Sequence, residues 1–279
     1  MPRAFPANSV IARVNEEPAI LLGAGRALVL QLAHPHVAAG VAEHSDFQHN
    51  PFKRLQGTLE AVYAMVYGPA ELADGVGRRV QWIHTFVRSE AYEANDPANL
   101  MWVHATLLET ALSCYEQVVR PLGPSGRETY YQEMVEVAER FGCPRDKQPA
   151  TYADFVDYWN QQVATLQVTD EGRRLVRDVI EPGRLPLNLQ VLLKPLLGVF
   201  KTATLGATPP AIRRQLGYAW NEKDERRYER IYALARLYHR MVPRPLRVAP
   251  GHVNGRILLW QASRHVRAFE AKQASNAGA

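Results

Sequence analysis

The chain has few cysteines, few hairpin signals and no long apolar run, and each absence argues against a class of protein. Few hairpin signals argue against a β-rich fold. Its two cysteines, Cys114 and Cys143, stand in no metal-ligand spacing, which is typical of a reducing compartment and argues against a disulfide framework. No run of about 18 uncharged apolar residues exists, so we expect no transmembrane helix. The N-terminal residues lack the apolar core of a signal peptide. Together these features predict a cytoplasmic protein.

Charge and catalytic motifs exclude further classes. The net charge is +5, but the sequence contains no contiguous block of lysines and arginines, so nucleic-acid binding is not expected. The motifs His-Glu-x-x-His, Glu-x-x-His and Gly-x-Ser-x-Gly are all missing, which leaves zinc proteases, di-iron helical bundles and serine hydrolases unsupported. The nine histidines are scattered instead. A haem needs only one of them as its protein ligand.

What the sequence does contain is helical periodicity, punctuated by capping residues and prolines. Asp96-Pro97 and Asn50-Pro51 each place a good N-cap residue before a proline, as at the start of a helix. A capping box is expected at 125–128, and Thr151 and Thr169 are each expected to open a helix. These signals predict a short helix after Pro35 and helices at about residues 18–33, 51–67, 69–92, 97–120, 125–141, 151–166, 169–180, 222–241 and 253–271.

We therefore predict an all-α fold with a single multi-helix domain over residues 1–279. Its core covers about residues 10–245, the C-terminal helix about 253–271, and the tail from Ala274 on is expected to fray. The two glycines of Gly23-Ala-Gly25 resemble part of a dinucleotide-binding motif, but the third glycine is missing, so close helix packing is preferred. Residues 185–200 are apolar and interrupted by prolines. They fit a core helix pair best, and the wall of an apolar pocket or a membrane-surface contact is the alternative.

One candidate for chemistry is a histidine inside an apolar helix face. Within the helix that starts at Pro97, His104 shares one face, at spacings of three and four, with Leu100, Leu107, Leu108, Ala111 and Tyr115. Such an imidazole is either a core histidine bonded to a backbone carbonyl or a metal or haem-iron ligand in an apolar cavity. From the spacing alone the core interpretation is preferred.

The second candidate is Arg54-Leu-Gln-Gly57-Thr58. Arg54 and Thr58 lie four residues apart, on the face that also carries Met65. A guanidinium suits haem propionates or a reduced-oxygen species, and a hydroxyl can donate to bound oxygen. The alternative is a surface arginine and a threonine bonded to its own helix, and spacing alone favours that alternative.

Four motifs in order make the sequence resemble a known family. Residues 34–45 read HPHVAAGVAEHS, residues 50–58 NPFKRLQGT, residues 92–97 YEANDP and residues 102–107 WVHATL. This combination resembles the oxygenase family that joins rubber oxygenase (latex-clearing protein) with MpaB of mycophenolic acid synthesis. The likeness extends over about residues 10–245.

The resemblance implies a globin-like helical domain that carries haem b and cleaves carbon–carbon double bonds of prenyl-type chains with dioxygen. It places His104 as the proximal iron ligand and Arg54 and Thr58 on the distal side. The family's distal lysine corresponds to Gly57 here, which leaves room for water, oxygen or another residue, and His44 and His34 are the candidates close by in the sequence. This departure also puts a rubber-type substrate in doubt.

The resulting hypothesis is a haem b-dependent oxygenase that acts on a small apolar substrate, prenyl-like or fatty, with dioxygen. The substrate would lie in a pocket lined by Met65, Leu107 and the 185–200 segment. Two alternatives stay open: a haem- or gas-binding protein without turnover, and a cofactor-free helical protein that binds an apolar ligand. A homodimer is compatible with the sequence.

Overall fold

The computed structural model describes the backbone of residues 2–44, 51–90, 92–181 and 187–277; the side chains of residues 44, 51–55, 187–192 and 277 lie outside that description. Helices make up most of the described chain, and no strand occurs in it. The all-α prediction is confirmed. The globin-like arrangement and the division into a single domain stay predictions.

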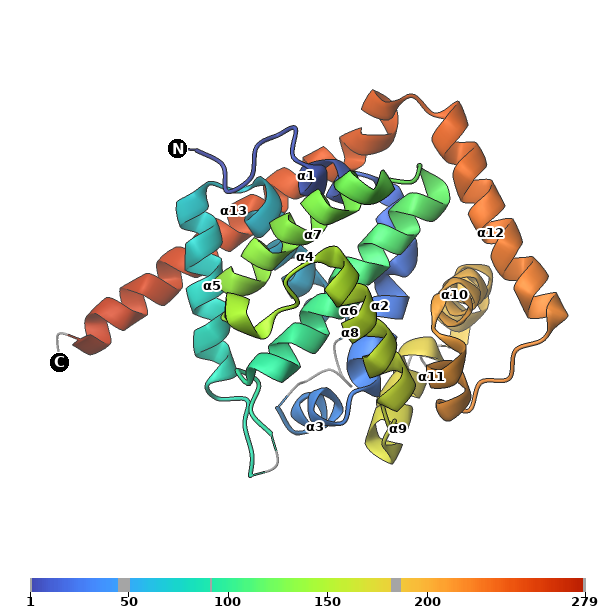
Figure 1. Cartoon of the computed structure of the whole chain (residues 1–279), viewed down its shortest axis with the longest axis horizontal. Coiled ribbons are helices and arrows are strands. Elements are labelled where there is room, and N and C mark those ends of the chain that lie inside the picture. The colour runs from blue at the N-terminus through green and yellow to red at the C-terminus, as the bar shows by residue number, and fades with distance from the viewer. Residues whose placement is uncertain (1, 45–50, 91, 182–186, 278–279) are drawn as a thin grey trace.

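The helices follow one another through the whole chain (Figure 1). In order, the structure contains α1 (Val10–Asn15), the 3-10 helix η1 (Pro18–Gly23), α2 (Ala24–Ala33), α3 (Pro35–His44), α4 (Pro51–Tyr67), α5 (Ala70–His84), α6 (Pro97–Val118), α7 (Gly123–Arg140), the 3-10 helix η3 (Arg145–Lys147), α8 (Tyr152–Thr165), α9 (Asp170–Ile180), α10 (Leu187–Ala207), α11 (Pro210–Gln215), α12 (Glu222–Met241) and α13 (Arg244–Ala277).

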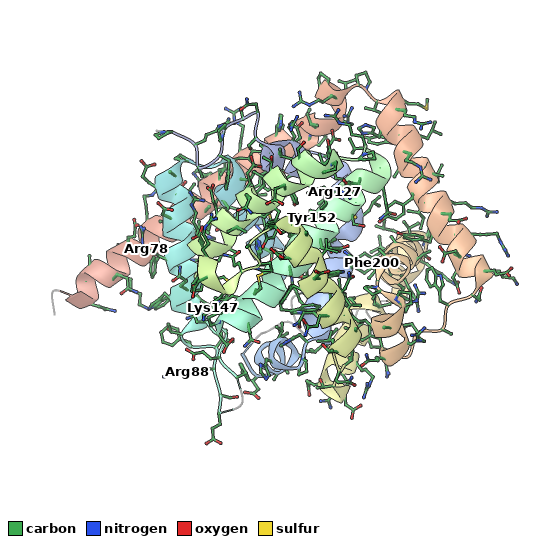
Figure 2. The ribbon with its side chains drawn as sticks, viewed as in Figure 1. Arg78, Arg88, Arg127, Lys147, Tyr152 and Phe200 are labelled. Atoms are coloured by element: carbon green, nitrogen blue, oxygen red, sulfur yellow. The ribbon has the colours of Figure 1, made fainter. Side chains whose placement is uncertain are left out.

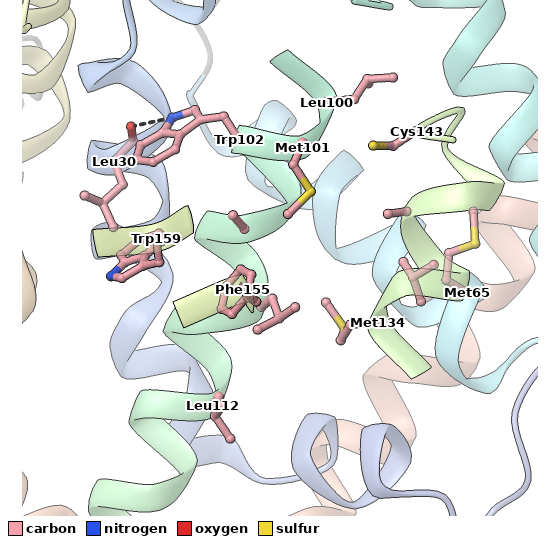
Figure 3. Close-up of a cluster of buried hydrophobic side chains, with 14 of the residues drawn as sticks. Leu30, Met65, Leu100, Met101, Trp102, Leu112, Met134, Cys143, Phe155 and Trp159 are labelled. Atoms are coloured by element: carbon pink, nitrogen blue, oxygen red, sulfur yellow. Dashed lines mark hydrogen bonds between the residues drawn. The ribbon is translucent and has the colours of Figure 1, made fainter. Parts of the chain in front are cut away.

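Helix α6 lies at the centre of the fold. As predicted, Asp96 caps its N-terminus, and the carboxylate accepts a hydrogen bond of 2.7 Å from the amide of Ala98. Helices α2, α7, α12 and η1 pack around it, so α6 is buried on more sides than the single apolar face that we predicted. Figure 3 shows one such contact, where the Trp102 indole donates to the Leu30 carbonyl at 3.1 Å. The Trp102 ring also stacks on Trp159 of α8, with centroids 5.7 Å apart.

Two glycines let η1 and α2 approach their neighbours closely. A Cβ atom added to Gly23 would lie 2.3 Å from a methyl carbon of Thr110 on α6. One added to Gly25 would lie 2.0 Å from the Thr204 hydroxyl and 2.7 Å from the ring of Phe200, which Figure 2 labels on α10. These contacts confirm close helix packing as the reason for the glycines of 23–25, in place of a dinucleotide-binding role.

Several predicted boundaries are wrong. Residues 18–23 form a 3-10 turn that precedes α2, α5 ends at His84, and α13 continues through Ala277 instead of fraying from Ala274. The predicted capping box at residues 125–128 is absent, because α7 already starts at Gly123 and has no side-chain cap. The Glu128 carboxylate accepts instead from the amide of Tyr152 at 2.9 Å and so anchors the start of α8. The predicted helix start at Thr151 is confirmed, and the structure adds a capping box between Thr151 and Asp154 that we did not predict.

The C-terminal helix α13 packs along α4 and α5 and passes behind the body of the molecule (Figure 1). The His265 ring bonds the buried Glu60 carboxylate of α4 at 2.8 Å. Gly255 leaves room for the Tyr63 ring, which a Cβ atom there would meet at 2.6 Å. At the other end of α13, Arg247 holds the buried Glu17 carboxylate with bonds of 2.9 and 2.8 Å. Helix α4 is therefore held in place by the last helix of the chain.

Within the described residues, none of the helices combines the length and the apolar character that a membrane span requires.

Candidate functional site

His104 lies in the middle of α6 and is almost completely buried, with 6% of its surface exposed. Its Nε2 atom has no hydrogen-bond partner among the described residues. Burial lowers the pKa of the imidazole from 6.5 to about 4, so the ring is neutral near pH 7 and its unprotonated nitrogen keeps a lone pair. A buried polar atom without a partner costs stability unless something absent from the protein chain satisfies it. His104 therefore does not fit the interpretation of a core histidine whose Nε2 bonds a backbone carbonyl.

His34 lies at the C-terminal end of α2 and against the N-terminal half of α6. Its ring is 5.9 Å from that of Trp102, which stands two positions before His104. The Nδ1 atom of His34 is likewise buried without a partner among the described residues. Burial, and to a smaller degree the neighbouring His36, lower the pKa of His34 to about 4. His36 bonds Asn99 of α6 at 3.3 Å. The structure thus brings His34, as a second neutral imidazole, to the helix that carries His104, but on the side of Trp102, because residues two apart in a helix do not share a face.

The group expected on the distal side lies on α4, and the structure describes part of it. Arg54 falls in the first turns of α4 and His44 is the last residue of α3, but both side chains lie outside the described residues. Thr58 is half-buried on α4. Gly57 is exposed, and a Cβ atom added there would meet nothing within 4 Å. The missing lysine at position 57 is therefore not a requirement of packing.

The residues expected to line a substrate pocket do not share one environment. Met65 of α4 is fully buried and belongs to the same core cluster as Leu108 of α6, while Leu107 is half-buried. In α10, the described residues 193–199 are largely exposed, and Leu196 has 63% of its surface exposed. The preferred interpretation of residues 185–200 as a core helix pair is wrong for this part, because a single helix runs through Pro195 and, among its described side chains, later ones such as Leu205 reach the core.

A buried arginine was missed by the sequence analysis. The Arg26 guanidinium pairs with Glu109, donates to the Thr110 hydroxyl at 2.7 Å and donates to the Ala207 carbonyl at 2.7 Å. It also lies over the ring of Trp159, 5.5 Å from the centroid. The guanidinium therefore joins α2 to α6, α8 and α10 close to the middle of the fold. The only charged residue of the largely apolar run 24–33 was the available signal, because a buried charge needs such partners.

The ligand chemistry of the described residues suits a haem iron better than a metal ion held by several side chains. Among the described residues there is no cluster of three or more histidine, cysteine or acidic side chains that would bind a metal ion. A haem needs one neutral imidazole in apolar surroundings, and the unpartnered Nε2 of His104 meets that need. A hollow of about 350 Å³ on α9 is lined by Glu171, Arg174, Arg177 and Asp178, and this charged lining does not suit an apolar ligand.

Comparison with known proteins gives the family. The catalytic-domain family described as ER-bound oxygenase mpaB/B'/Rubber oxygenase matches residues 12–237. Similar curated proteins are the uncharacterized protein Mb2261 of Mycobacterium bovis and the uncharacterized protein Rv2237 of Mycobacterium tuberculosis. Each is 27% identical over 225 residues, which cover 77% of this chain and 87% of the relative. No solved structure matches the chain significantly.

The matched residues run from α1 to α12 and include the helices that carry His34, Thr58 and His104. This chain belongs to the family of ER-bound oxygenase mpaB/B'/Rubber oxygenase catalytic domains.

Proposed function

We propose that this chain is a haem b-dependent oxygenase in which His104 is the iron ligand. Membership of an oxygenase catalytic-domain family supports an enzyme that uses dioxygen and a small-molecule substrate. The observation that carries the haem proposal is the buried, unpartnered Nε2 of His104. A bound haem would supply an iron centre for dioxygen chemistry, while the protein supplies binding and orientation.

In this proposal α6 presents a neutral imidazole from a rigid position. Because burial lowers the pKa of His104 to about 4, no proton has to leave the ring near neutral pH before Nε2 donates its lone pair. The side chains around α6 keep water away from that nitrogen, since Leu108 of the following turn is fully buried. The cost of leaving Nε2 unpaired in the free protein becomes part of the binding energy for the cofactor.

We propose that Arg54 and Thr58 line the pocket that His104 faces, where they would orient and polarise dioxygen. Helix α4, which carries both, contributes Met65 to the core cluster that includes Leu108 of α6. His34 and His44 complete the proposed cofactor-binding set, because Gly57 offers no side chain there. The neutral state and buried Nδ1 of His34 support that part of the set.

The substrate in this proposal is a small apolar molecule, prenyl-like or fatty. The support is the family and the apolar residues Met65 and Leu107 on the two helices concerned. The cytoplasmic location and the homodimer also stay part of the proposal.

The test is to purify the protein with added haem and record its absorption spectrum. We expect a Soret band that is lost or strongly shifted in His104→Ala, and unchanged in the exposed control His252→Ala. Oxygen consumption with cleavage of an alkene such as a short prenyl alcohol would then separate an oxygenase from a haem carrier. A colourless protein, or a Soret band identical in His104→Ala, would contradict the ligand assignment and favour the cofactor-free alternative.

A further inference from the structure

The outer face of α12 is apolar at its C-terminal end and has nothing packed on it among the described residues. Leu234, Leu237, Tyr238 and Met241 recur at spacings of three and four, which places them on one side of the helix. Leu234 has 65% of its surface exposed and Met241 70%. A series of large apolar side chains at such exposure on one face of a helix is typical of an interaction surface.

The opposite face fixes the orientation of α12. Tyr232 is buried, and its hydroxyl lies 3.6 Å from the Cys114 sulfur of α6. The Tyr228 hydroxyl donates to Gln117 of α6 at 3.2 Å. Because these contacts hold the inner face against α6 and α10, α12 cannot turn its apolar side inward without losing them.

The apolar surface continues past the bend between α12 and α13, which Figure 1 shows as an elbow at the edge of the molecule. In α13 the inner positions Val248, Gly255, Ala262 and Val266 are buried. Exposed apolar side chains recur on the other side of that helix. We call the exposed set on both helices the outer stripe; it consists of Leu234, Leu237, Tyr238, Met241, Leu246, Val253, Ile257 and Trp260.

The segment that carries the outer stripe is rich in arginine, although Arg244 and Arg247 pair with Glu16 and Glu17. Residues 230–269 contain eight arginines and no aspartate or glutamate. The whole chain has a net charge of only +5, so the rest of the protein is net negative. The arginines are spaced along two helices, which is why the sequence shows no contiguous basic block. Arg230, Arg240 and Arg256 are exposed, and no ion pair or hydrogen bond to another described residue holds their guanidinium groups.

We propose that the α12–α13 elbow docks onto an anionic lipid bilayer. A helix face that combines Leu, Met and Trp with flanking arginines binds in the headgroup region, where apolar side chains enter the acyl boundary and arginines meet lipid phosphates. Trp260 suits that boundary because its ring is apolar and its N–H is polar. The inference concerns a surface remote from His104 and stands whether or not the chain binds haem.

The charges argue against a second copy of the chain as the occupant. A two-fold interface would place the same face on both partners, and the unpaired Arg230, Arg240 and Arg256 of one copy would then repel those of the other. A purely polyanionic partner, such as a nucleic acid, would use the arginines but leave the apolar side chains exposed. A bilayer uses both.

The experiment is co-sedimentation of the full chain with large unilamellar vesicles. One set consists of phosphatidylcholine alone and the other also contains phosphatidylserine as about a third of the lipid. We expect at least tenfold stronger partitioning to the anionic vesicles, and weaker partitioning at high salt. Arg230→Gln with Arg240→Gln should lower partitioning more than tenfold at low salt, because each arginine near such a surface contributes about fivefold.

The apolar contribution is tested with Leu237→Glu combined with Met241→Glu, which should lower partitioning to anionic vesicles at least tenfold. The matched control is Phe86→Glu, an equally exposed apolar residue that follows α5, with 61% of its surface exposed. It should bind like the unmodified chain. Circular dichroism checks that each variant is folded, as expected for exposed positions.

Three results would overturn the proposal: no binding to anionic vesicles, equal loss in Phe86→Glu and the α12 variant, or full binding by the α12 variant. A fourth contradicting result would come from light scattering, which measures the oligomeric state. A dimer that becomes a monomer in Leu237→Glu with Met241→Glu, with vesicle binding unchanged, would assign this face to a second copy.

Discussion

Replacing His104 by leucine should make the cofactor-free protein more stable, although it removes the residue on which the proposed chemistry depends. Leucine has a similar volume and no polar atom, so it fills the site and removes the buried, unpartnered Nε2. A buried polar group without a hydrogen bond costs about 1–3 kcal/mol. We therefore expect His104→Leu to raise the free energy of unfolding at pH 7.5 by about that amount.

Acidification should widen the difference in stability between His104→Leu and the unmodified protein. The pKa of His104 is lowered from 6.5 to about 4 by burial, so the folded state binds fewer protons than the unfolded state between these two pH values. The unmodified protein then loses stability as the pH falls from 6.5 to about 4. Lowering this pKa from 6.5 to about 4 corresponds to a loss of about 3 kcal/mol from this residue. The leucine variant has no group there to protonate and should not show this loss.

The assay is urea unfolding of both proteins, prepared without haem, at a series of pH values from 7.5 down to 4.5. His252→Leu is the control for replacing an exposed histidine and should change stability by less than about 0.5 kcal/mol. The reasoning is refuted if His104→Leu is less stable than the unmodified protein at pH 7.5. Parallel pH profiles of the two proteins would refute it as well.

Three further predictions concern backbone positions and the distal side of the proposed site. Gly25→Ala should lower the free energy of unfolding by about 1–3 kcal/mol, because its Cβ would lie 2.0 Å from the Thr204 hydroxyl. Gly57→Ala should raise the free energy of unfolding by about 0.5–1 kcal/mol, since that site on α4 is open. Thermal unfolding measures both changes, and equal effects would contradict the packing argument. Thr151→Ala should lower the free energy of unfolding by about 1 kcal/mol through loss of the capping box. Ser125→Ala should have little effect on stability, because α7 has no side-chain cap. A similar loss of stability in both variants would show that Ser125 caps α7 after all. In haem-loaded protein, Gly57→Lys should shift the absorption spectrum by placing an amine on the distal side, and an unchanged spectrum would argue against that placement.

Local signals in the sequence predicted most of the helices. The N-cap residues Asp96, Thr151 and Thr169 each accept a backbone amide as expected. The failures arise where tertiary contacts overrule such signals. Glu128 is not used in a capping box, because it anchors the start of α8 instead. Residues 253–271 belong to a longer helix that runs through Pro250, since packing on α4 and α5 compensates for the missing backbone hydrogen bond.

The candidate site could be predicted in part. The periodicity around His104 gave its burial, but it could not distinguish a bonded core histidine from one whose Nε2 lacks a partner, because that depends on neighbouring helices. The buried contacts of Arg26 could not be predicted for the same reason, because its partners Glu109, Thr110 and Ala207 are distant from it in the sequence. The positions of Arg54, Thr58 and His44 relative to His104 stay predictions.

The packing of α13 against α4 couples the end of the chain to the proposed oxygen-handling residues. The matched family region ends at residue 237, so α13 lies entirely beyond it, yet Gly255 and His265 support the helix on which Arg54 and Thr58 stand. A shortened protein that stops at the family boundary would leave Glu60 without its imidazole partner and uncover the inner side of α4. Activity lost on such trimming would then reflect a displaced helix, even though every residue assigned to the chemistry had been retained.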